Sequence, residues 1–115
     1  MMDRKFLEWI EENLRDPESA LWKRTTDTQY RTYTIEYTDW NVAKRKHTRM
    51  RKEFSGFFAC YKLNSKNGYG GYAGSRRVVA YESFSGDGFI VLHNDWRGDN
   101  GKENLARELI SRCPL

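Results

Sequence analysis

The sequence FSGFFACYKL at residues 54–63 decides the fold, because the rest of the chain can be placed around this apolar run. In an extended chain its apolar side chains fall on two faces: Phe57, Ala59, Tyr61 and Leu63 on one, Phe58 and Cys60 on the other. A strand that is apolar on both faces must be covered from both sides, which is typical of a central strand. We therefore expect this stretch to form the middle of a sheet.

Three other segments have the character of strands. Residues 30–38 alternate tyrosine and isoleucine with threonine and glutamate, which predicts a strand with one polar face. Residues 76–84 hold the apolar run VVAY, and the turn signal SGDG separates them from a further strand at residues 89–93. The glycine-rich residues 64–74 predict a loop that leads out of the central strand.

A helix is expected near each end of the chain. Residues 3–14 repeat apolar side chains at helical spacing, and the following Asp16-Pro17 ends that helix and begins a short second turn. Residues 102–112 form the second helix, which stops before Pro114. The order is helix, four strands, helix, without a strand–helix–strand unit, so the sheet is antiparallel. The prediction is a single α+β domain over residues 1–115. Its N-terminal helix packs on a four-stranded antiparallel sheet, and the second helix lies at the C-terminus.

The composition is that of a folded chain and excludes several classes of protein. The 115 residues include 4 Trp, 7 Tyr and 6 Phe, and the net charge is only +4, a combination that disordered chains lack. The length excludes a two-domain enzyme. No apolar run approaches the ~18 residues that cross a membrane. The N-terminal residues carry no secretory signal, so we expect a cytoplasmic location, with a mature form whose signal has been removed as the alternative, and no membrane partner.

The two cysteines, Cys60 and Cys113, allow two interpretations. The preferred one is a pair of reduced, buried thiols, as in most cytoplasmic proteins. The alternative is a disulfide formed in an oxidising compartment. Two cysteines are too few for a structural zinc site without the two histidines, so we expect no metal.

The positive charge is concentrated in one segment, KRKHTRMRK at residues 44–52. It holds six of the 20 basic side chains and none of the 16 acidic ones, so the remainder, with 14 basic and 16 acidic, carries −2. Such a cluster is typical of surfaces that bind phosphate backbones or acidic proteins. The alternative is a solvated loop or hairpin flank without a partner. An exposed tryptophan beside the segment would be an interface anchor. The candidate binding residues are Trp40, Lys44, Arg45, Lys46, Arg49, Arg51, Lys52, Lys66, Arg76 and Arg77.

No arrangement of residues indicates catalysis. The run GYGGYA at residues 68–73 matches the dinucleotide pattern G-x-G-x-x-A, but it leads into a strand and not into a helix, so no dinucleotide site is expected. His93 and Cys60 are the residues that a small enzyme would use, yet Cys60 lies in an apolar strand and no base is aimed at it. We expect a protein that is not an enzyme and has no cofactor.

Two motifs carry a family resemblance. The first is Asp16-Pro17-x-Ser19-Ala20-x-Trp22, and the second is Cys60-x-x-x-Asn64-x-Lys66-Asn67-x-x-Gly70-Gly71-Tyr72-x-Gly74. They resemble the motifs of a family of small uncharacterised bacterial and phage domains, many of them exported or lipoprotein-like. The resemblance covers roughly residues 5–82 and implies a helix packed on a small antiparallel sheet. It implies no activity.

These observations favour a non-enzymatic binding module. By analogy with small basic phage proteins, the leading hypothesis is an inhibitor from a phage or mobile element, of the anti-defence or anti-CRISPR type. It would dock on a host protein or nucleoprotein through the basic segment. The alternative is direct binding of RNA or single-stranded DNA, for which aromatic and basic side chains on one surface are typical.

Overall fold

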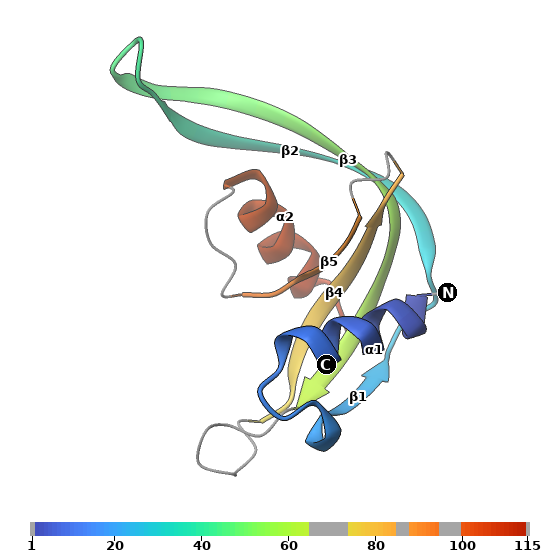
Figure 1. The fold of residues 1–115 in the computed structure, drawn as a ribbon. Helices are drawn as coiled ribbons and strands as arrows, with labels where there is room; N and C mark the ends of the chain where they lie inside the picture. Colours follow the sequence, from blue (N-terminus) through green and yellow to red (C-terminus); the bar gives the residue numbers. More distant parts are fainter. Residues whose placement is uncertain (1, 65–73, 85–87, 95–99, 115) are drawn as a thin grey trace.

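The computed structural model describes residues 2–64, 74–84, 88–94 and 100–114. The elements follow in the order α1 (Met2–Asn13), the 3-10 helix η1 (Pro17–Ser19), β1 (Leu21–Arg24), β2 (Gln29–Asn41), β3 (Lys46–Asn64), β4 (Arg76–Ser83), β5 (Phe89–Leu92) and α2 (Asn100–Ser111). The predicted α+β class is confirmed, with a helix before and a helix after an antiparallel sheet (Figure 1). The sheet has five strands, one more than expected.

Strand β3 organises the sheet, as the sequence predicts. One of its edges pairs with β1 over Tyr61–Asn64 and with β2 over Lys46–Phe58. Its other edge pairs with β4 over Gly56–Leu63, and β4 in turn pairs with β5. All of these pairings are antiparallel. In addition, each face of β3 contributes to a buried cluster, and the apolar side chains that residues 54–63 carry on both faces meet that requirement.

The two helices cover opposite faces of the sheet, so the core has two separate clusters. On the α1 face, Phe6 stacks on Tyr61 with 4.0 Å between ring centroids, and both side chains are fully buried. The complete cluster on this face is Met2, Phe6, Ile10, Ala59, Tyr61, Leu63, Val78, Ala80 and Val91. The alternate residues of the same strands point to α2, as expected from the two-residue period of a strand.

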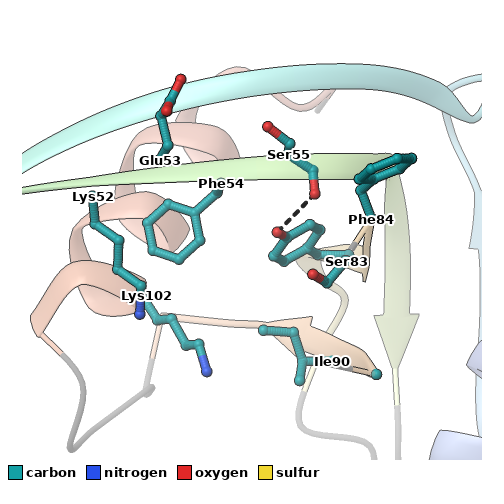
Figure 2. Close-up of a pocket in the computed structure, with 10 residues that line it drawn as sticks. Lys52, Glu53, Phe54, Ser55, Ser83, Phe84, Ile90 and Lys102 are labelled. Carbon is teal, nitrogen blue, oxygen red and sulfur yellow. Dashed lines mark hydrogen bonds between the residues drawn. The ribbon is translucent and has the colours of Figure 1, made fainter. Parts of the chain in front are cut away.

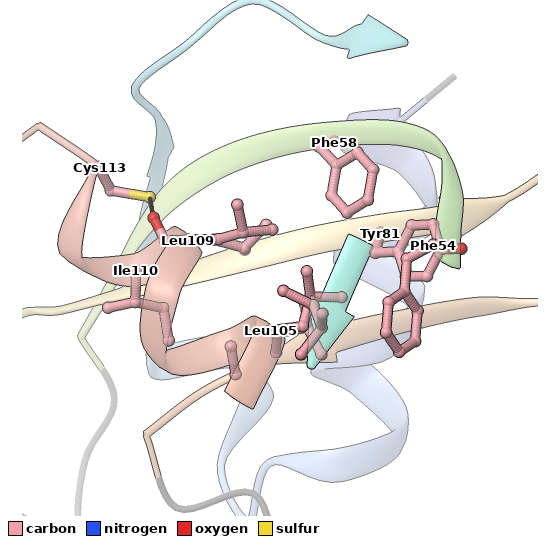
Figure 3. Packing of buried hydrophobic residues seen from close by; sticks show 11 residues of the cluster. Phe54, Phe58, Tyr81, Leu105, Leu109, Ile110 and Cys113 are labelled. Carbon is pink, nitrogen blue, oxygen red and sulfur yellow. Dashed lines mark hydrogen bonds between the residues drawn. The ribbon is translucent and has the colours of Figure 1, made fainter. Parts of the chain in front are cut away.

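The α2 face is built around stacked aromatic rings. Phe58 of β3 lies on Tyr81 of β4 with 4.5 Å between centroids, and the rings are nearly parallel. Leucines from α2 close this cluster (Figure 3). Its buried members are Ile35, Phe54, Phe58, Val79, Tyr81, Leu92, Leu105, Ala106, Leu109, Ile110 and Cys113.

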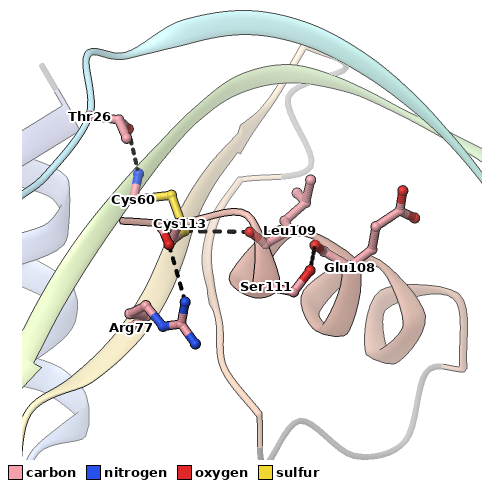
Figure 4. Close-up of a disulfide and its surroundings, with 7 residues drawn as sticks. All are labelled: Thr26, Cys60, Arg77, Glu108, Leu109, Ser111 and Cys113. Atoms are coloured by element: carbon pink, nitrogen blue, oxygen red, sulfur yellow. Dashed lines mark hydrogen bonds between the residues drawn. A yellow bond between two sulfur atoms is a disulfide. The ribbon is translucent and has the colours of Figure 1, made fainter. Parts of the chain in front are cut away.

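A disulfide joins Cys60 of β3 to Cys113, which follows α2 (Figure 4). The preferred expectation of two reduced thiols is therefore wrong. Cys60 points to the α2 face, and the end of α2 brings the Cα of Cys113 to 5.8 Å from that of Cys60, within the range that a disulfide requires. The bridge ties the last turn of α2 to the central strand. The cytoplasmic location stays a prediction.

Gly56 marks the position where β3 leaves the compact part of the sheet. A Cβ at this position would lie 2.1 Å from the backbone oxygen of Glu82 in β4, so only glycine fits between the two strands. Beyond it, towards its N-terminal end, β3 pairs with β2 alone. This close approach therefore sits where the five-stranded sheet becomes a two-stranded hairpin.

Candidate binding surface

The β2–β3 hairpin, which we define as residues 29–58, carries the basic segment away from the body of the protein. Its strands pair from Gln29 with Phe58 to Asn41 with Lys46, and its outer half arcs over α2 and past it (Figure 1). The sequence allows the basic segment to be a loop or a hairpin flank. In the structure, residues 42–45 form the turn at the tip, and Lys46 to Lys52 belong to strand β3.

The turn at the tip is held by a side chain of the first strand. The Oδ1 atom of Asn41 accepts a hydrogen bond from the backbone nitrogen of Lys44 at 3.0 Å, a typical way for asparagine to close a turn. Arg45 then adopts a φ of 51°, the left-handed conformation that brings the chain back into β3. These contacts place Lys44, Arg45 and Lys46 at the outer end of the hairpin, all exposed.

Basic side chains lie on both faces of the hairpin. Because cross-strand partners share a face, Trp40 and His47 lie together on the face away from α2, followed by Arg49 and Arg51. The opposite face carries Lys46 and Lys52 beside residues of the α2 cluster. The hairpin as a whole holds seven basic and three acidic side chains, a net charge of +4. The net charge of the chain is also +4, so the hairpin accounts for all of it.

An aromatic pair stands near the tip. The Trp40 ring meets the His47 ring edge-to-face, with 5.3 Å between centroids, and 53% of Trp40 is exposed. Nearby, Arg49 reaches Glu36 at 3.9 Å while its own side chain stays 82% exposed. An ion pair this exposed is worth little, so Arg49 can exchange Glu36 for a partner's carboxylate. The aromatic ring and the cations thus face solvent together, as expected of an anchor for a partner.

Two of the predicted residues lie far from this surface. Arg76 and Arg77 pair with Leu63 and Lys62 at the other end of β3, ten residues or more from Lys52. At about 3.3 Å per residue this separation is roughly 30 Å. Arg77 also donates a hydrogen bond to the backbone oxygen of Cys113 at 3.1 Å, a structural contact. Lys66 lies outside the described residues. The structure therefore brings together seven of the ten candidates.

Sequence reasoning missed an aromatic patch and a hollow at the base of the hairpin. Phe57 lies on the predicted face but is 44% exposed, because α1 covers only the far end of β3. It packs against Tyr30, which in turn packs against Phe84, and both of these residues are also exposed. On the other face, between β3, β5 and α2, lies a hollow of about 290 Å³, into which Phe54 and Ile90 point (Figure 2). Neither feature can be predicted from residue spacing, because both lie where β4 ends and the position of that end is not visible in the sequence.

The described residues offer no metal site and no helix for a membrane. Within them, histidine, cysteine, aspartate and glutamate nowhere gather in threes close enough to hold an ion. Neither described helix has the length and apolarity to span a bilayer. Comparison of the chain with protein-family models, with curated proteins and with solved structures finds no match. The family resemblance of the two motifs stays a prediction, and what the chain binds has to be argued from the hairpin itself.

Proposed function

We propose that this chain is a non-enzymatic binding module whose β2–β3 hairpin docks on an acidic surface of a host protein or nucleoprotein. One observation carries the proposal: the net charge of the chain resides in a hairpin that extends beyond the compact sheet. A field concentrated in this way steers an acidic partner to one place on the molecule. The role of a phage-encoded inhibitor of the anti-CRISPR type is carried over from the sequence argument by analogy.

A protein surface fits the hairpin better than a nucleic acid does. Glu36, Asp39 and Glu53 lie between the cations along the same two strands. A phosphate backbone laid along the hairpin would meet these carboxylates, whereas a protein surface of mixed charge can match both signs. The exposed Trp40 ring beside Arg49 is the observation that supports RNA or single-stranded DNA as the second candidate.

Photocrosslinking from the tip of the hairpin tests the proposal. Val42 in the turn is 80% exposed, so a benzophenone amino acid there will react with whatever covers the tip. The tip variant carries Ser at Lys44, Arg45 and Lys46. The matched control carries Ser at Arg15, Lys23 and Arg76, which are equally basic, exposed and outside the hairpin.

The result expected in lysate of the source cells is a crosslinked protein that survives nuclease, is lost in the tip variant and persists in the control. Loss of the product in both triple variants would mean that only total charge matters, and the hairpin would no longer be the docking element. A product that nuclease removes would favour nucleic acid. In that case, contact of the six basic side chains of residues 44–52 with phosphates predicts that the logarithm of the association constant falls with the logarithm of the salt concentration with a slope of roughly −4.

A further inference from the structure

Strand β3 has one edge that no described strand occupies. Its residues 46–58 pair with β2 on one side, but on the other side the pairing with β4 reaches only as far as Gly56. We call the side of Lys46–Phe54 that faces away from β2 the open edge. Among the described residues no strand lies along it. Exposed edges of this kind are templates on which another chain can add as a strand.

The backbone groups on the open edge can be identified. The oxygen of Ser55 accepts a hydrogen bond from the backbone nitrogen of Phe84 at 2.9 Å, so Ser55 directs its backbone to the β4 side. Because this direction alternates along a strand, the backbone groups of Glu53, Arg51, Arg49 and His47 point to the same side. Residues between them are bonded to β2. The open edge thus presents four residues of donors and acceptors in a row.

The outer edge of β2 differs, because α2 covers part of it. Asn104 donates a side-chain hydrogen bond to the backbone oxygen of Glu36, and Asn100 donates one to that of Thr38, each at 3.5 Å. Glu36 and Thr38 are the partners of Arg51 and Arg49, whose backbone groups point away from β2, so the carbonyls of Glu36 and Thr38 point away from β3. The helix therefore occupies the outer edge of β2 where the hairpin passes over it, and β3 offers the better edge to a partner.

The hollow of about 290 Å³ lies at the inner end of the open edge. Its wall is formed by Phe54 and Ser55 of β3, by Ile90 of β5 and by the end of β4, and the charged residues Lys52, Glu53 and Lys102 also line it (Figure 2). A strand added along β3 would continue the line of β4, and the residues at the Phe54 end of that strand would reach this hollow. The volume is enough for one apolar side chain, the kind of pocket that gives specificity in strand addition.

The charge along the open edge selects the occupant. Arg49 and Arg51 flank it on one face and Lys46 and Lys52 on the other, and Glu53 at its inner end is the one acidic residue among Lys46–Phe54. Two copies of this chain would bring the same cations together across the edge and repel each other. An acidic extended segment with carboxylates at alternate positions would meet the two cations of one face with opposite charge and place its other side chains on the opposite face.

We propose that the open edge of β3 binds an extended acidic segment of the partner protein as an added antiparallel or parallel β-strand, with an apolar side chain of that segment in the hollow beside Phe54. This inference rests on the proposed function and specifies how the hairpin takes its partner. Backbone hydrogen bonds supply the affinity, and the cations with the hollow supply the selectivity.

A labelled peptide of about nine residues, the length of the open edge, tests the inference. Glutamate alternates with valine in this probe, and a lysine–valine peptide is the control. The protein variants are Arg51→Pro and Arg51→Thr, which lose the same charge. Proline also removes the amide hydrogen that points to the open edge, without removing a bond to β2. Circular dichroism of both variants shows whether the hairpin is intact.

We expect the acidic peptide to bind the wild type and the lysine peptide not to bind. Arg51→Pro should bind at least about tenfold more weakly than Arg51→Thr, the equivalent of one to two hydrogen bonds and a steric clash. On binding, amide hydrogen exchange should slow at His47, Arg49 and Arg51, while the amides of Thr48 and Met50, bonded to β2, should change little.

Several outcomes would overturn the inference. Equal affinities of the two Arg51 variants, with unchanged exchange at Arg49, would show that charge alone binds the peptide; the proposed function would stand. Failure of the peptide to bind, while the Val42 crosslink still captures a protein, would also overturn strand addition alone. Slow exchange at Arg49 that depends on protein concentration without peptide would indicate self-pairing. Absence of both peptide binding and crosslink would remove the proposed function as well.

Discussion

Removal of the Cys60–Cys113 disulfide should cost a large part of the stability of this protein. The two residues are 53 positions apart, so the bridge closes a long loop in the unfolded chain. The chain-entropy relation for that separation gives about 4 kcal/mol. A domain of this size has a total stability of about 5–15 kcal/mol. The loss would therefore lower the thermal midpoint by roughly 15 °C.

The assay compares the oxidised wild type with a Cys60→Ala, Cys113→Ala variant in urea. The mutation removes the crosslink without leaving thiols that could reoxidise, and linear extrapolation gives the difference in unfolding free energy. A matched control is Leu105→Ala, which deletes a buried side chain of the same cluster but keeps the bridge. We expect that control to lose about 2–5 kcal/mol through a cavity and lost contacts.

Two results would refute this reasoning. Equal urea midpoints for the wild type and the double variant would mean that the bridge does not constrain the unfolded chain. Alkylation in denaturant, after acid quenching of intact cells, provides the other measurement, because Cys113 is buried in the folded protein. Two labelled thiols would show that the residues stay reduced in the cell, and the cytoplasmic expectation would gain support. A single species without label would favour an oxidising compartment.

Three further predictions concern a hydroxyl, a glycine and a tryptophan. The Tyr61 hydroxyl donates a 2.5 Å hydrogen bond to Asp3, and burial together with that bond raises the pKa of Tyr61 above its usual 10.0. The stabilising effect of the neutral hydroxyl is therefore present below pH 10 and is lost as the pH rises further. Tyr61→Phe should cost about 1 kcal/mol at pH 7 and make the unfolding free energy less dependent on pH above 10. Gly56→Ala forces a Cβ against the Glu82 oxygen and should cost at least about 2 kcal/mol in urea unfolding. Trp40→Ala should change unfolding free energy by less than about 0.5 kcal/mol while it weakens the Val42 crosslink.

Each of these predictions has a result that contradicts it. Parallel pH curves for wild type and Tyr61→Phe would show that another group controls alkaline unfolding. Gly88→Ala is the control for Gly56, because it also has a positive φ but open space around it, and an equal loss in both would assign the effect to backbone strain. A strongly destabilised Trp40→Ala would place that ring in the folding core and not at an interface.

The parts of the fold that could be predicted are those in which burial leaves a pattern in the sequence. Residues 54–63 carry apolar side chains on both faces of the strand, and the structure places them at the centre of the sheet. Helix α1 was expected at residues 3–14 and spans Met2–Asn13; α2 was expected at residues 102–112 and spans Asn100–Ser111. In each helix, side chains at helical spacing face one cluster, and that spacing is visible in the sequence.

The parts that could not be predicted depend on partners far away in the chain. Strand β3 extends to Lys46 because it pairs with β2, although KHTRMRKE is polar on both faces and shows no alternation. Strand β1 has four residues, and Leu21 at its start is 59% exposed, so burial leaves no signal there. To predict the disulfide, one must know which face of the sheet Cys60 points to and where α2 ends. The separation of Arg76 and Arg77 from the hairpin likewise follows only from the register with β4.

The two ends of β3 differ in function, because one end packs in the core and the other lies at the exposed tip of the hairpin, and this difference affects how the sequence can change. Residues 38–50, at the tip of the hairpin, contribute no side chain to either cluster among the described residues, while residues 54–63 of the same strand contribute to both. Substitutions at the tip therefore escape the close packing that limits which side chains fit in the core. Substitution of about a dozen residues between Thr38 and Met50 could therefore change the partner while the core and the fold stay the same. The same property makes the tip a position at which a foreign recognition sequence can be grafted.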